Sequence, residues 1–375
     1  MKIIVYFCCL FFLKSMYKIS ERLQEWFVGH HRDLPWRDTK DPYLIWVSEI
    51  VLQQTQVAQG TNYYLRFIDR FPDVQSLADA EQMEVLKYWQ GLGYYSRARN
   101  LHEAAKDVMS RFQGVFPEVY KDILSLKGIG EYTAAAIASF AWNLPYPVLD
   151  GNVYRVLGRL FAVSTPIDTG KGKKEYRELA AMIMPPHQAG EHNQAIMEFG
   201  ALQCVPQHPT CAECPLSDNC MAYNAGNPQL YPVKEKKPKT RDRYLNYFFI
   251  TFGSHTFLHC RSEKDIWKGL YEFPLIETDK PLNFTEIQNE PAFKKLFHSA
   301  STSTFTLEKE NVKHTLTHQT LHATFYRVEI QKEPAIIKNY VKLPLSKIED
   351  YPFPKLISAF LQQSLCTSVP PVPLC

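Results

Sequence analysis

The chain has 375 residues, 45% hydrophobic and 22% charged, a composition that allows two or three folded domains and excludes an intrinsically disordered protein. Lys and Arg number 42 against 39 Asp and Glu, so the net charge of +3 by itself identifies no class of partner. Four of the nine cysteines fall within residues 204–220, which predicts a metal site in a reducing cell rather than a secreted disulfide framework.

Residues 3–13 are an apolar run between Lys2 and Lys14. The run is shorter than the about 20 residues that cross a bilayer, and no small-residue cleavage site follows it. Amphipathic spacing begins at Ile19, shortly after Met16. We therefore expect Met16 to be the native start and residues 1–15 to be a non-native extension, which N-terminal sequencing of the natural protein would test.

Residues 16–230 show mostly helical periodicity and predict an all-α domain. Residues 231–243 are rich in Lys and Arg and predict a basic linker, which either lies along a polyanion or is an ordinary solvated linker. After it, the aromatic and β-branched runs 244–252 and 323–330 predict strands of a smaller α+β domain over residues 244–366. The proline-rich tail 367–375 is predicted to be disordered.

A glycine-containing turn lies within residues 118–142. The sequence predicts helices over 118–125 and 131–142, with Gly128 and Gly130 permitting a tight hairpin between them. The backbone N–H groups that begin the second helix would then bind phosphate without basic side chains. Alone, this pattern also fits any linker between two helices.

Two carboxylates are candidates for acid and anion in glycosidic bond cleavage. Glu49 is the only charge in residues 44–52, where burial would raise its pKa. Asp150 directly precedes a predicted helix over 152–161, whose first amides would keep it ionised. The alternatives are an ion pair of Glu49 with Arg32 or Arg37, and a plain helix-capping role for Asp150.

The cysteines Cys204, Cys211, Cys214 and Cys220 are spaced to close on one metal centre, either structural zinc or an iron–sulfur cluster. Zinc ribbons usually bring two C-x2-C pairs, and this loop has one. The spacing is similar to that of the four-iron, four-sulfur loop in DNA glycosylases of the endonuclease III type, which favours the cluster.

In this order, the hairpin, Asp150 and the cysteine loop resemble the helix-hairpin-helix base-excision glycosylases. Five short strings narrow the resemblance to the adenine DNA glycosylases, and with the C-terminal domain it covers most of the chain. The strings are Leu-Pro-Trp-Arg at 34–37, Glu-Ile-Val-Leu-Gln-Gln-Thr at 49–55, Gly-Leu-Gly-Tyr-Tyr-Ser-Arg at 91–97, Asp-Gly-Asn-Val at 150–153 and Asn-Gln-Ala at 193–195.

The resemblance implies a monofunctional enzyme of base excision repair that binds a [4Fe-4S] cluster and double-stranded DNA with adenine opposite 8-oxoguanine or guanine. The adenine would be flipped out of the duplex. Glu49 would protonate its N7, and Asp150 would stabilise or trap the oxocarbenium-like sugar, with Tyr132 and Asn152 as positioning groups nearby. Residues implied to contact the adenine or the DNA are Arg32, Trp36, Arg37, Gln54, Thr55, Leu92, Tyr94, Gly128, Gly130 and Gln194.

Gln54 and Tyr94 resemble wedges pushed into the base stack beside 8-oxoguanine, with Leu92 and Thr55 next to them. The alternative for Leu92, Trp36 and Tyr94 is core packing.

The C-terminal domain resembles a Nudix-type fold, with residues 267–274 fitting the strand that enters it. Glu286 and Glu290 follow without the glycine and arginine of a working Nudix helix, so we expect no pyrophosphohydrolase activity. Residues 314–318 are similar to the Phe-Ser-His loop that probes 8-oxoguanine, although leucine and threonine replace the phenylalanine and serine. Thr317 and His318 are therefore predicted to contact the lesion, the alternative being an ordinary strand-joining loop.

Two further function classes were weighed. A bifunctional glycosylase/lyase carries a Schiff-base lysine two residues beyond the second hairpin glycine, where this chain has Tyr132, and Lys127 lies on the wrong side of the turn. A redox-sensing DNA-binding protein would not need the pair Glu49 and Asp150. We expect a monomer in the bacterial cytosol or nucleoid, without membrane contact.

Overall fold

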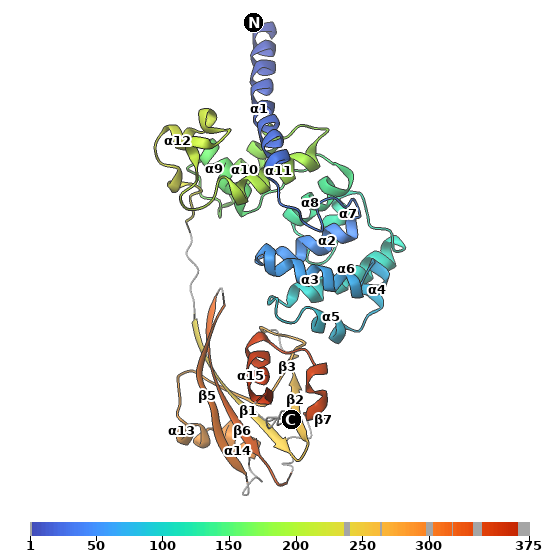
Figure 1. Ribbon diagram of the computed structural model, residues 1–375, viewed down its shortest axis with the longest axis vertical. Helices are drawn as coiled ribbons and strands as arrows, with labels where there is room; N and C mark the ends of the chain where they lie inside the picture. The colour runs from blue at the N-terminus through green and yellow to red at the C-terminus, as the bar shows by residue number, and fades with distance from the viewer. Residues whose placement is uncertain are drawn as a thin grey trace, which may run out of the picture. The chain divides into compact units, whose positions relative to one another are not determined.

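The computed structural model describes residues 2–235, 241–262, 265–297, 303–316, 318–332 and 340–366, with side chains from Met16 to Ser364. The chain forms two compact units. The first contains residues 1–79 and 100–236, and the second contains residues 80–99 and 237–375 (Figure 1). Within the described ranges, no helix is long and apolar enough to cross a membrane. The predicted tail 367–375 lies outside the described residues.

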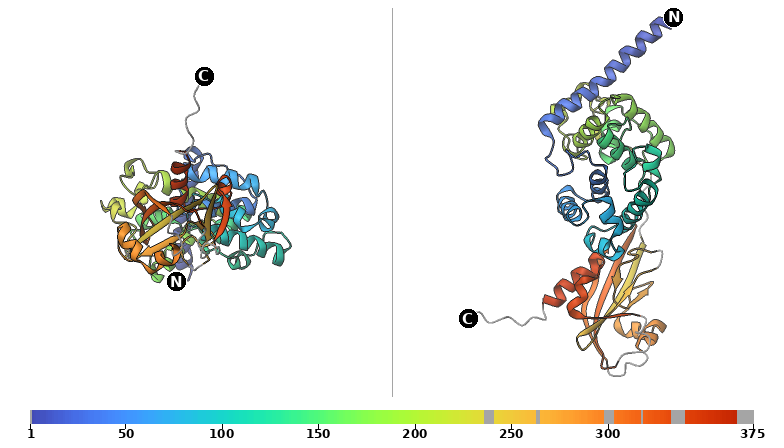
Figure 2. Two further views of the ribbon diagram at one scale, coloured as in Figure 1. Left: turned by 90° about the horizontal axis from the view of Figure 1, so that it is seen from below. Right: turned by 90° about the vertical axis from the view of Figure 1, so that its right-hand side faces the viewer.

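The first unit is all-helical, as the periodicity predicts. Its helices are α1 (Lys2–His30), α2 (Pro42–Leu52), α3 (Val57–Arg70), α4 (Val74–Asp79), most of α6 (Ser96–Phe112), α7 (Tyr120–Ser125), α8 (Glu131–Trp142), α9 (Gly151–Leu160), α10 (Gly170–Ile183), α11 (Ala189–Leu202) and α12 (Met221–Asn224). The predicted helices 118–125, 131–142 and 152–161 thus correspond to α7, α8 and α9. Helix α1 runs unbroken from Lys2, so the predicted extension 2–15 continues the helix that follows it (Figure 2).

The centre of this unit is formed by α2, α8 and α11. Helix α2 packs against α8, and α11 packs against α1, α8 and α9. Trp46, Val47 and Val51 of α2 are fully buried, as are Ala134 and Ala136 of α8. The short side chains of α8 let neighbouring helices approach closely, which brings residues from distant parts of the sequence together.

The second unit contains a mixed seven-stranded sheet. Its strands are β1 (Arg241–Phe252), β2 (His255–Cys260), β3 (Tyr271–Glu272), β4 (Leu275–Thr278), β5 (Thr304–Thr315), β6 (Gln319–Glu329) and β7 (Val341–Pro344). The order is β3-β2-β1-β6-β5, while β4 pairs with β1 and β7 with β2. Strands β1 and β6 are parallel, from Arg241 opposite Gln319 to Thr251 opposite Glu329.

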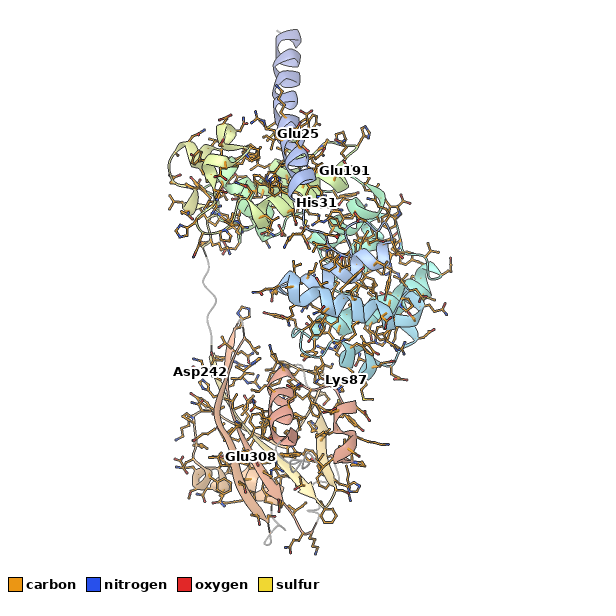
Figure 3. The ribbon with its side chains drawn as sticks, in the orientation of Figure 1. Glu25, His31, Lys87, Glu191, Asp242 and Glu308 are labelled. Atoms are coloured by element: carbon orange, nitrogen blue, oxygen red, sulfur yellow. The ribbon has the colours of Figure 1, made fainter. Side chains whose placement is uncertain are left out.

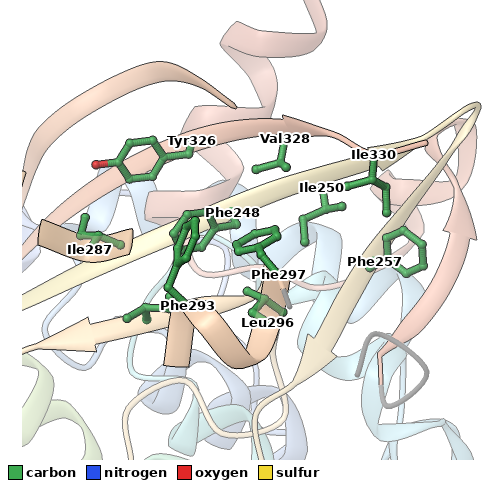
Figure 4. Close-up of a cluster of buried hydrophobic side chains, with 11 residues drawn as sticks. Phe248, Ile250, Phe257, Ile287, Phe293, Leu296, Phe297, Tyr326, Val328 and Ile330 are labelled. Atoms are coloured by element: carbon green, nitrogen blue, oxygen red, sulfur yellow. The ribbon is translucent and has the colours of Figure 1, made fainter. Parts of the chain in front are cut away.

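Helices cover both faces of this sheet (Figure 2). On one face, Phe248 and Ile250 of β1 pack with α13 (Phe284–Asn289) and α14 (Pro291–Phe297) in an apolar cluster (Figure 4). On the other face, the ring of Phe360 in α15 (Lys355–Cys366) stacks on Phe325 at 4.3 Å. Alternate residues of β1 therefore face different helices, as the period of two in a strand requires. The short helix α5 (Gln82–Tyr88) also belongs to this unit.

Two expectations about this unit are corrected by the structure. The predicted strand over 267–274 is wrong in its first half, because Trp267 and Gly269 have φ of 65° and 80° and form a turn before the short β3. The end of the predicted linker is part of β1, where Arg243 is buried and pairs with Asp265 at 2.8 Å and Glu277 at 2.6 Å. Arg243 therefore serves the fold and is not free to bind a polyanion.

Candidate active site and nucleic-acid interface

Glu49 lies in the buried face of α2, with only 6% of its surface exposed. The hydroxyl of Tyr132, at the start of α8, donates a hydrogen bond of 2.6 Å to Glu49 Oε2. Burial raises the pKa of Glu49 to about 7, with a further rise from the charge of Asp150, while the Tyr132 hydrogen bond opposes both. A carboxyl group with this pKa still carries its proton near neutral pH, which general acid catalysis requires.

The alternative ion pair of Glu49 with Arg32 or Arg37 is wrong. Both arginines bind Glu198 of α11 instead. Arg32 Nε and Nη2 donate to the two carboxylate oxygens at 2.8 Å each, and Arg37 Nη2 lies 3.1 Å from Oε2. The Arg32 hydrogen bonds help to lower the pKa of Glu198 despite its burial. Glu198 was not predicted from the sequence, because no motif near it in the sequence indicates a functional residue.

The predicted adenine-pocket residues are partly brought together around this carboxylate. Arg32 and Arg37 both bind Glu198, and Arg37 Nη1 also donates to Gln194 Oε1 at 3.2 Å. Trp36 is half-buried, and its ring meets that of Tyr64 edge-on at 5.2 Å. Core packing therefore accounts for part of the Trp36 surface.

Asp150 is the N-cap of α9. Its Oδ1 accepts a hydrogen bond of 2.7 Å from the Val153 amide, and its Oδ2 accepts one of 2.8 Å from Asn152 Nδ2. These bonds favour the carboxylate, but burial has the larger effect and raises the pKa of Asp150. The helix amide and Asn152 act in the direction that was expected, and the ionised form of Asp150 stays a prediction. Desolvation raises the pKa of both carboxyl groups.

A row of hydrogen bonds connects Asp150 with the cysteine loop through Arg155, which the sequence analysis missed. Arg155 Nη2 donates to Asn152 Oδ1 at 2.8 Å, and its Nε donates to the Cys204 carbonyl at 2.7 Å. Arg155 lies one helical turn after Asn152, a spacing that places both side chains on one face of α9. Gly200 lies against Asn152, where an added Cβ would come within 2.7 Å of the Asn152 Cβ.

Cys204 follows the end of α11, and the other three predicted metal-binding cysteines lie in or directly after two short 3-10 turns. None of the four is in a disulfide. Burial raises the pKa of the Cys214 thiol to about 11, and the neighbouring cysteines contribute. Arg159 Nη1 lies 3.3 Å from Cys204 Sγ, so a guanidinium group contacts one of the four sulfur atoms. Among the described residues, however, no group of three or more His, Cys, Asp or Glu is already arranged to hold a metal ion.

The hairpin depends on one of its two glycines. Gly128 has φ of 81°, and an added Cβ would lie 2.6 Å from the Asn100 Cβ. Gly130 has φ of −96°, which any residue adopts, and an added Cβ there would meet nothing within 4 Å. Both glycines thus permit the turn as predicted, but only position 128 requires a glycine. As the N-cap of α8, Gly130 offers no side chain to the first amides of the helix. Glu131, the first residue of that helix, pairs with Arg177.

The two predicted wedge residues share an unusual backbone conformation. Gln54 and Tyr94 have φ of 55° and 45°. Such left-handed residues are uncommon outside glycine and often occur at functional sites. Both side chains are exposed, 47% in the case of Tyr94, whereas Leu92 is 8% exposed. The core-packing alternative therefore fits Leu92 and not Tyr94. Thr55 is half-buried, and its hydroxyl donates to the Gln53 carbonyl at 3.3 Å.

The predicted lesion-reading segment lies between β5 and β6. His314 and Thr315 belong to β5, so the connection itself begins at Leu316, whose amide donates to the Gln319 carbonyl at 2.7 Å. Thr317 lies outside the described residues. His318 is exposed, and its carbonyl accepts a hydrogen bond of 3.2 Å from the Arg241 amide.

Where a Nudix enzyme would have its acidic helix, this chain has α13 and α14. The Glu286 carboxylate accepts a hydrogen bond of 2.8 Å from the Asn283 amide, and the Asn283 side chain caps the Glu286 amide in return. Glu286 is thus used in a capping box. Glu290 ends α13.

Comparison with protein families gives two matches. A model described as "HhH-GPD superfamily base excision DNA repair protein" matches residues 47–184, and one described as "NUDIX domain" matches residues 246–363.

Three similar curated proteins have the same name, "Adenine DNA glycosylase". A Buchnera aphidicola protein from Schizaphis graminum named "Adenine DNA glycosylase" is 37% identical over 265 residues, 70% of this chain and 76% of its own length. Another of that name, from the Buchnera of Acyrthosiphon pisum, is 36% identical over 76% of this chain and 84% of its own length. A Homo sapiens protein of the same name is 42% identical over 53% of this chain and 38% of its own.

Among solved structures, one entitled "Structure of a thermostable thymine-DNA glycosylase" is 30% identical and has a TM-score of 0.53, covering 56% of this chain and 98% of its own. A complex of endonuclease III with DNA is 20% identical and has a TM-score of 0.50, covering 57% of this chain and 97% of its own. This likeness shows that the two proteins share a fold.

Proposed function

The chain belongs to the adenine DNA glycosylases, and we propose that it hydrolyses the N-glycosidic bond of adenine mispaired with 8-oxoguanine or guanine in duplex DNA. The observation that carries this proposal is the pair of buried Glu49 and half-buried Asp150, in which the first carboxyl group has a pKa of about 7 and the second caps a helix. Proximity to a positive sugar would favour the anion of Asp150.

We propose a reaction in three steps. The adenine leaves the base stack, because its glycosidic bond is unreachable within the duplex. Protonated Glu49 donates its proton to adenine N7 and makes the base a better leaving group. The carboxylate of Asp150 stabilises the oxocarbenium-like sugar or binds it covalently, and a water molecule then completes the hydrolysis.

Tyr132 and Asn152 are proposed to position the two carboxyl groups. Their hydrogen bonds to Glu49 and Asp150, of 2.6 and 2.8 Å, restrict the orientation of each group. Burial raises the pKa of Tyr132 well above its usual value, so its hydroxyl remains a donor. Because Tyr132 stands where lyases of this superfamily carry a nucleophilic lysine, we propose a monofunctional enzyme.

The test is single-turnover adenine release from duplexes that carry 8-oxoguanine, guanine or cytosine opposite the adenine. We expect release opposite the first two bases and little opposite cytosine. Glu49→Gln should abolish most release while duplex binding stays nearly intact, because the amide keeps the shape of the carboxyl group. A wild-type protein that binds these duplexes and releases no adenine would refute the proposal.

We propose that DNA contacts involve the hairpin, the wedge residues and a pocket for the flipped base. At the hairpin, the first amides of α8 would bind a backbone phosphate. The exposed side chains of Gln54 and Tyr94 would enter the base stack. Arg32 and Gln194 would contact the adenine, with Arg37 and Trp36 supporting them. DNA as substrate also implies that the protein works in the cytosol or nucleoid.

We further propose that the four cysteines at 204, 211, 214 and 220 hold a [4Fe-4S] cluster. Four cysteines that form no disulfide and lie within residues 204–220 suit this group, and the Arg159 guanidinium contacts the sulfur of Cys204. When bound, the cluster would shape the loop and carry out no chemistry on the base. Purified protein should be yellow-brown. A colourless protein with stoichiometric zinc would show that the metal is zinc.

A matched pair of serine variants tests the ligands. Cys211→Ser should lower iron content and DNA affinity together, whereas Cys260→Ser should change neither, because Cys260 is an exposed cysteine in the second unit. Equal iron loss in both variants would contradict the assignment.

The segment between β5 and β6 is proposed to read the lesion. Thr317 and His318 would hydrogen-bond 8-oxoguanine or a neighbouring phosphate. Because a hydrogen bond whose loss leaves its partner unpaired is worth about 1–3 kcal/mol, the double variant Thr317→Ala/His318→Ala should slow release opposite 8-oxoguanine much more than opposite guanine. Equal slowing opposite both bases would show that this segment does not read the lesion. The distinction between 8-oxoguanine and guanine would then depend on Gln54, Thr55, Leu92 and Tyr94.

A further inference from the structure

The loop that carries Tyr94 is part of the second compact unit. We call residues 89–95 the wedge loop. Residues 80–99, which include it, group with the C-terminal domain and not with the helices that precede and follow them in the sequence. The contacts that join this segment to the C-terminal domain therefore decide where Tyr94 is held.

The wedge loop is joined to the backbone of Phe353, just before α15. The Phe353 carbonyl accepts a hydrogen bond of 3.2 Å from the Tyr95 hydroxyl, and its amide donates one of 3.4 Å to Gln90 Oε1. Gln90 Nε2 in turn donates to Ser358 Oγ at 2.8 Å. Two neighbouring side chains of the loop thus bind both backbone groups of one residue and a hydroxyl of the following helix.

Both flanks of the loop are also attached to the C-terminal domain. On the N-terminal side, Lys87 Nζ donates to the Glu349 carbonyl (Figure 3 labels Lys87). On the C-terminal side, Arg99 Nη1 donates to the Lys268 carbonyl at 2.6 Å. These bonds to backbone carbonyls lie on either side of Tyr94 in the sequence, so the loop is held at its two ends as well as in the middle.

The interior of the loop is fixed by its own hydrogen bonds. The Tyr95 hydroxyl accepts a bond of 3.2 Å from the Gly91 amide, and Trp89 Nε1 donates to the Gly93 carbonyl at 3.2 Å. The Arg97 guanidinium lies over the rings of Trp89 and Tyr94, at 5.3 and 5.6 Å. A shift at Tyr95 is therefore transmitted to the backbone beside Tyr94.

Two adjacent tyrosines have opposite environments as a result. Tyr95 is 3% exposed and faces the C-terminal domain, whereas Tyr94 is 47% exposed. The backbone between them is left-handed at Tyr94, with φ of 45°. The same loop thus has one side for docking and another side for contact with a ligand.

We propose that the C-terminal domain positions the wedge residue Tyr94 through Tyr95, Gln90 and Ser358, and so contributes to opposite-base discrimination in addition to any direct contact made by the β5–β6 segment. This inference rests on the proposed function. Gln90, Tyr95 and Ser358 are positioning residues, because they act through Tyr94 and do not contact DNA themselves. The C-terminal domain then contributes to recognition in two separate ways.

The experiment removes the hydroxyl of Ser358 in the full-length protein. We expect Ser358→Ala to lower the ratio of single-turnover rates opposite 8-oxoguanine and opposite guanine by about fivefold, since one hydrogen bond is lost. Ser358→Thr keeps the hydroxyl and should restore the ratio. Gln362→Ala is the matched control, because Gln362 is an exposed side chain on the same helix.

The Tyr94→Ala protein distinguishes an effect of Ser358 that acts through Tyr94 from a merely structural role of Ser358. If Ser358 acts through Tyr94, the change Ser358→Ala should leave the rate ratio of the Tyr94→Ala protein unaltered. The same fivefold loss in both backgrounds, or no loss in either, would overturn the inference.

Hydrogen exchange gives a second measurement that needs no catalysis. Ser358→Ala should accelerate amide exchange in the peptide over residues 89–95, and Gln362→Ala should not. A wild-type protein without adenine release would refute the proposed function, and the exchange data would still decide whether the C-terminal domain holds the loop. Unchanged exchange in Ser358→Ala would refute the docking itself.

Discussion

Replacing Glu49 with glutamine is expected to stabilise the folded protein at alkaline pH while it abolishes base release. The folded-state pKa of Glu49 is about 7, against 4.5 for an ordinary glutamate. The folded state therefore binds this proton more tightly than the unfolded state does. The resulting stability is complete below pH 4.5 and is lost as the pH rises through 7.

The magnitude follows from the size of the shift. A difference of about 2.5 pKa units corresponds to about 3 kcal/mol that the wild-type protein loses between acid and alkaline pH. Glutamine does not ionise, and its carbonyl oxygen can still accept the hydrogen bond of Tyr132. The stability advantage of Glu49→Gln should therefore be under about 1 kcal/mol at pH 5 and about 3 kcal/mol at pH 8.

The assay compares the thermal unfolding midpoints of the two proteins at pH 5, 6, 7 and 8. For a unit of this size we expect the variant to unfold about 6–12 °C higher at pH 8, with the difference shrinking towards pH 5. The control is Glu191→Gln, because Glu191 is exposed on α11 (Figure 3). A difference that does not change with pH, or a wild-type protein that is the more stable at pH 8, would refute the reasoning.

Four further predictions concern the same unit. The single-turnover rate should fall about tenfold per pH unit above pH 7 as the acid form of Glu49 is lost. Tyr132→Phe should move this fall to higher pH, because it removes the hydroxyl that stabilises the carboxylate, and an unchanged midpoint would contradict that. Asp150→Asn should lose most base release with nearly unchanged duplex affinity in a gel-shift assay, and a parallel loss of both would argue against a catalytic role. Gly128→Ala should cost at least about 1–3 kcal/mol in urea unfolding, because φ is 81° and the added Cβ is crowded, whereas Gly130→Ala should be nearly neutral. Equal costs would contradict the assigned hairpin geometry.

Local features were determined by the sequence. The hairpin helices α7 and α8 were predicted within two residues of their observed ends, because alternating Gly positions and apolar spacing act over one or two turns. Asp150 was predicted to begin a helix for the same reason, since an N-cap and its first amides are only three residues apart. The family was also readable from short strings, because they contain the residues that carry the chemistry.

The tertiary structure alone decided how these residues are paired and charged. Tyr132 reaches Glu49 across 83 positions of sequence, and Arg32 reaches Glu198 across 166. At Asp150, desolvation raises the pKa by more than the capping hydrogen bonds lower it. Desolvation depends on all the atoms that surround the carboxyl group. Sequence spacing carries no information about such surroundings. Folding alone also assigns residues 80–99 to the second unit, because contacts between distant segments, and not chain order, define a compact unit.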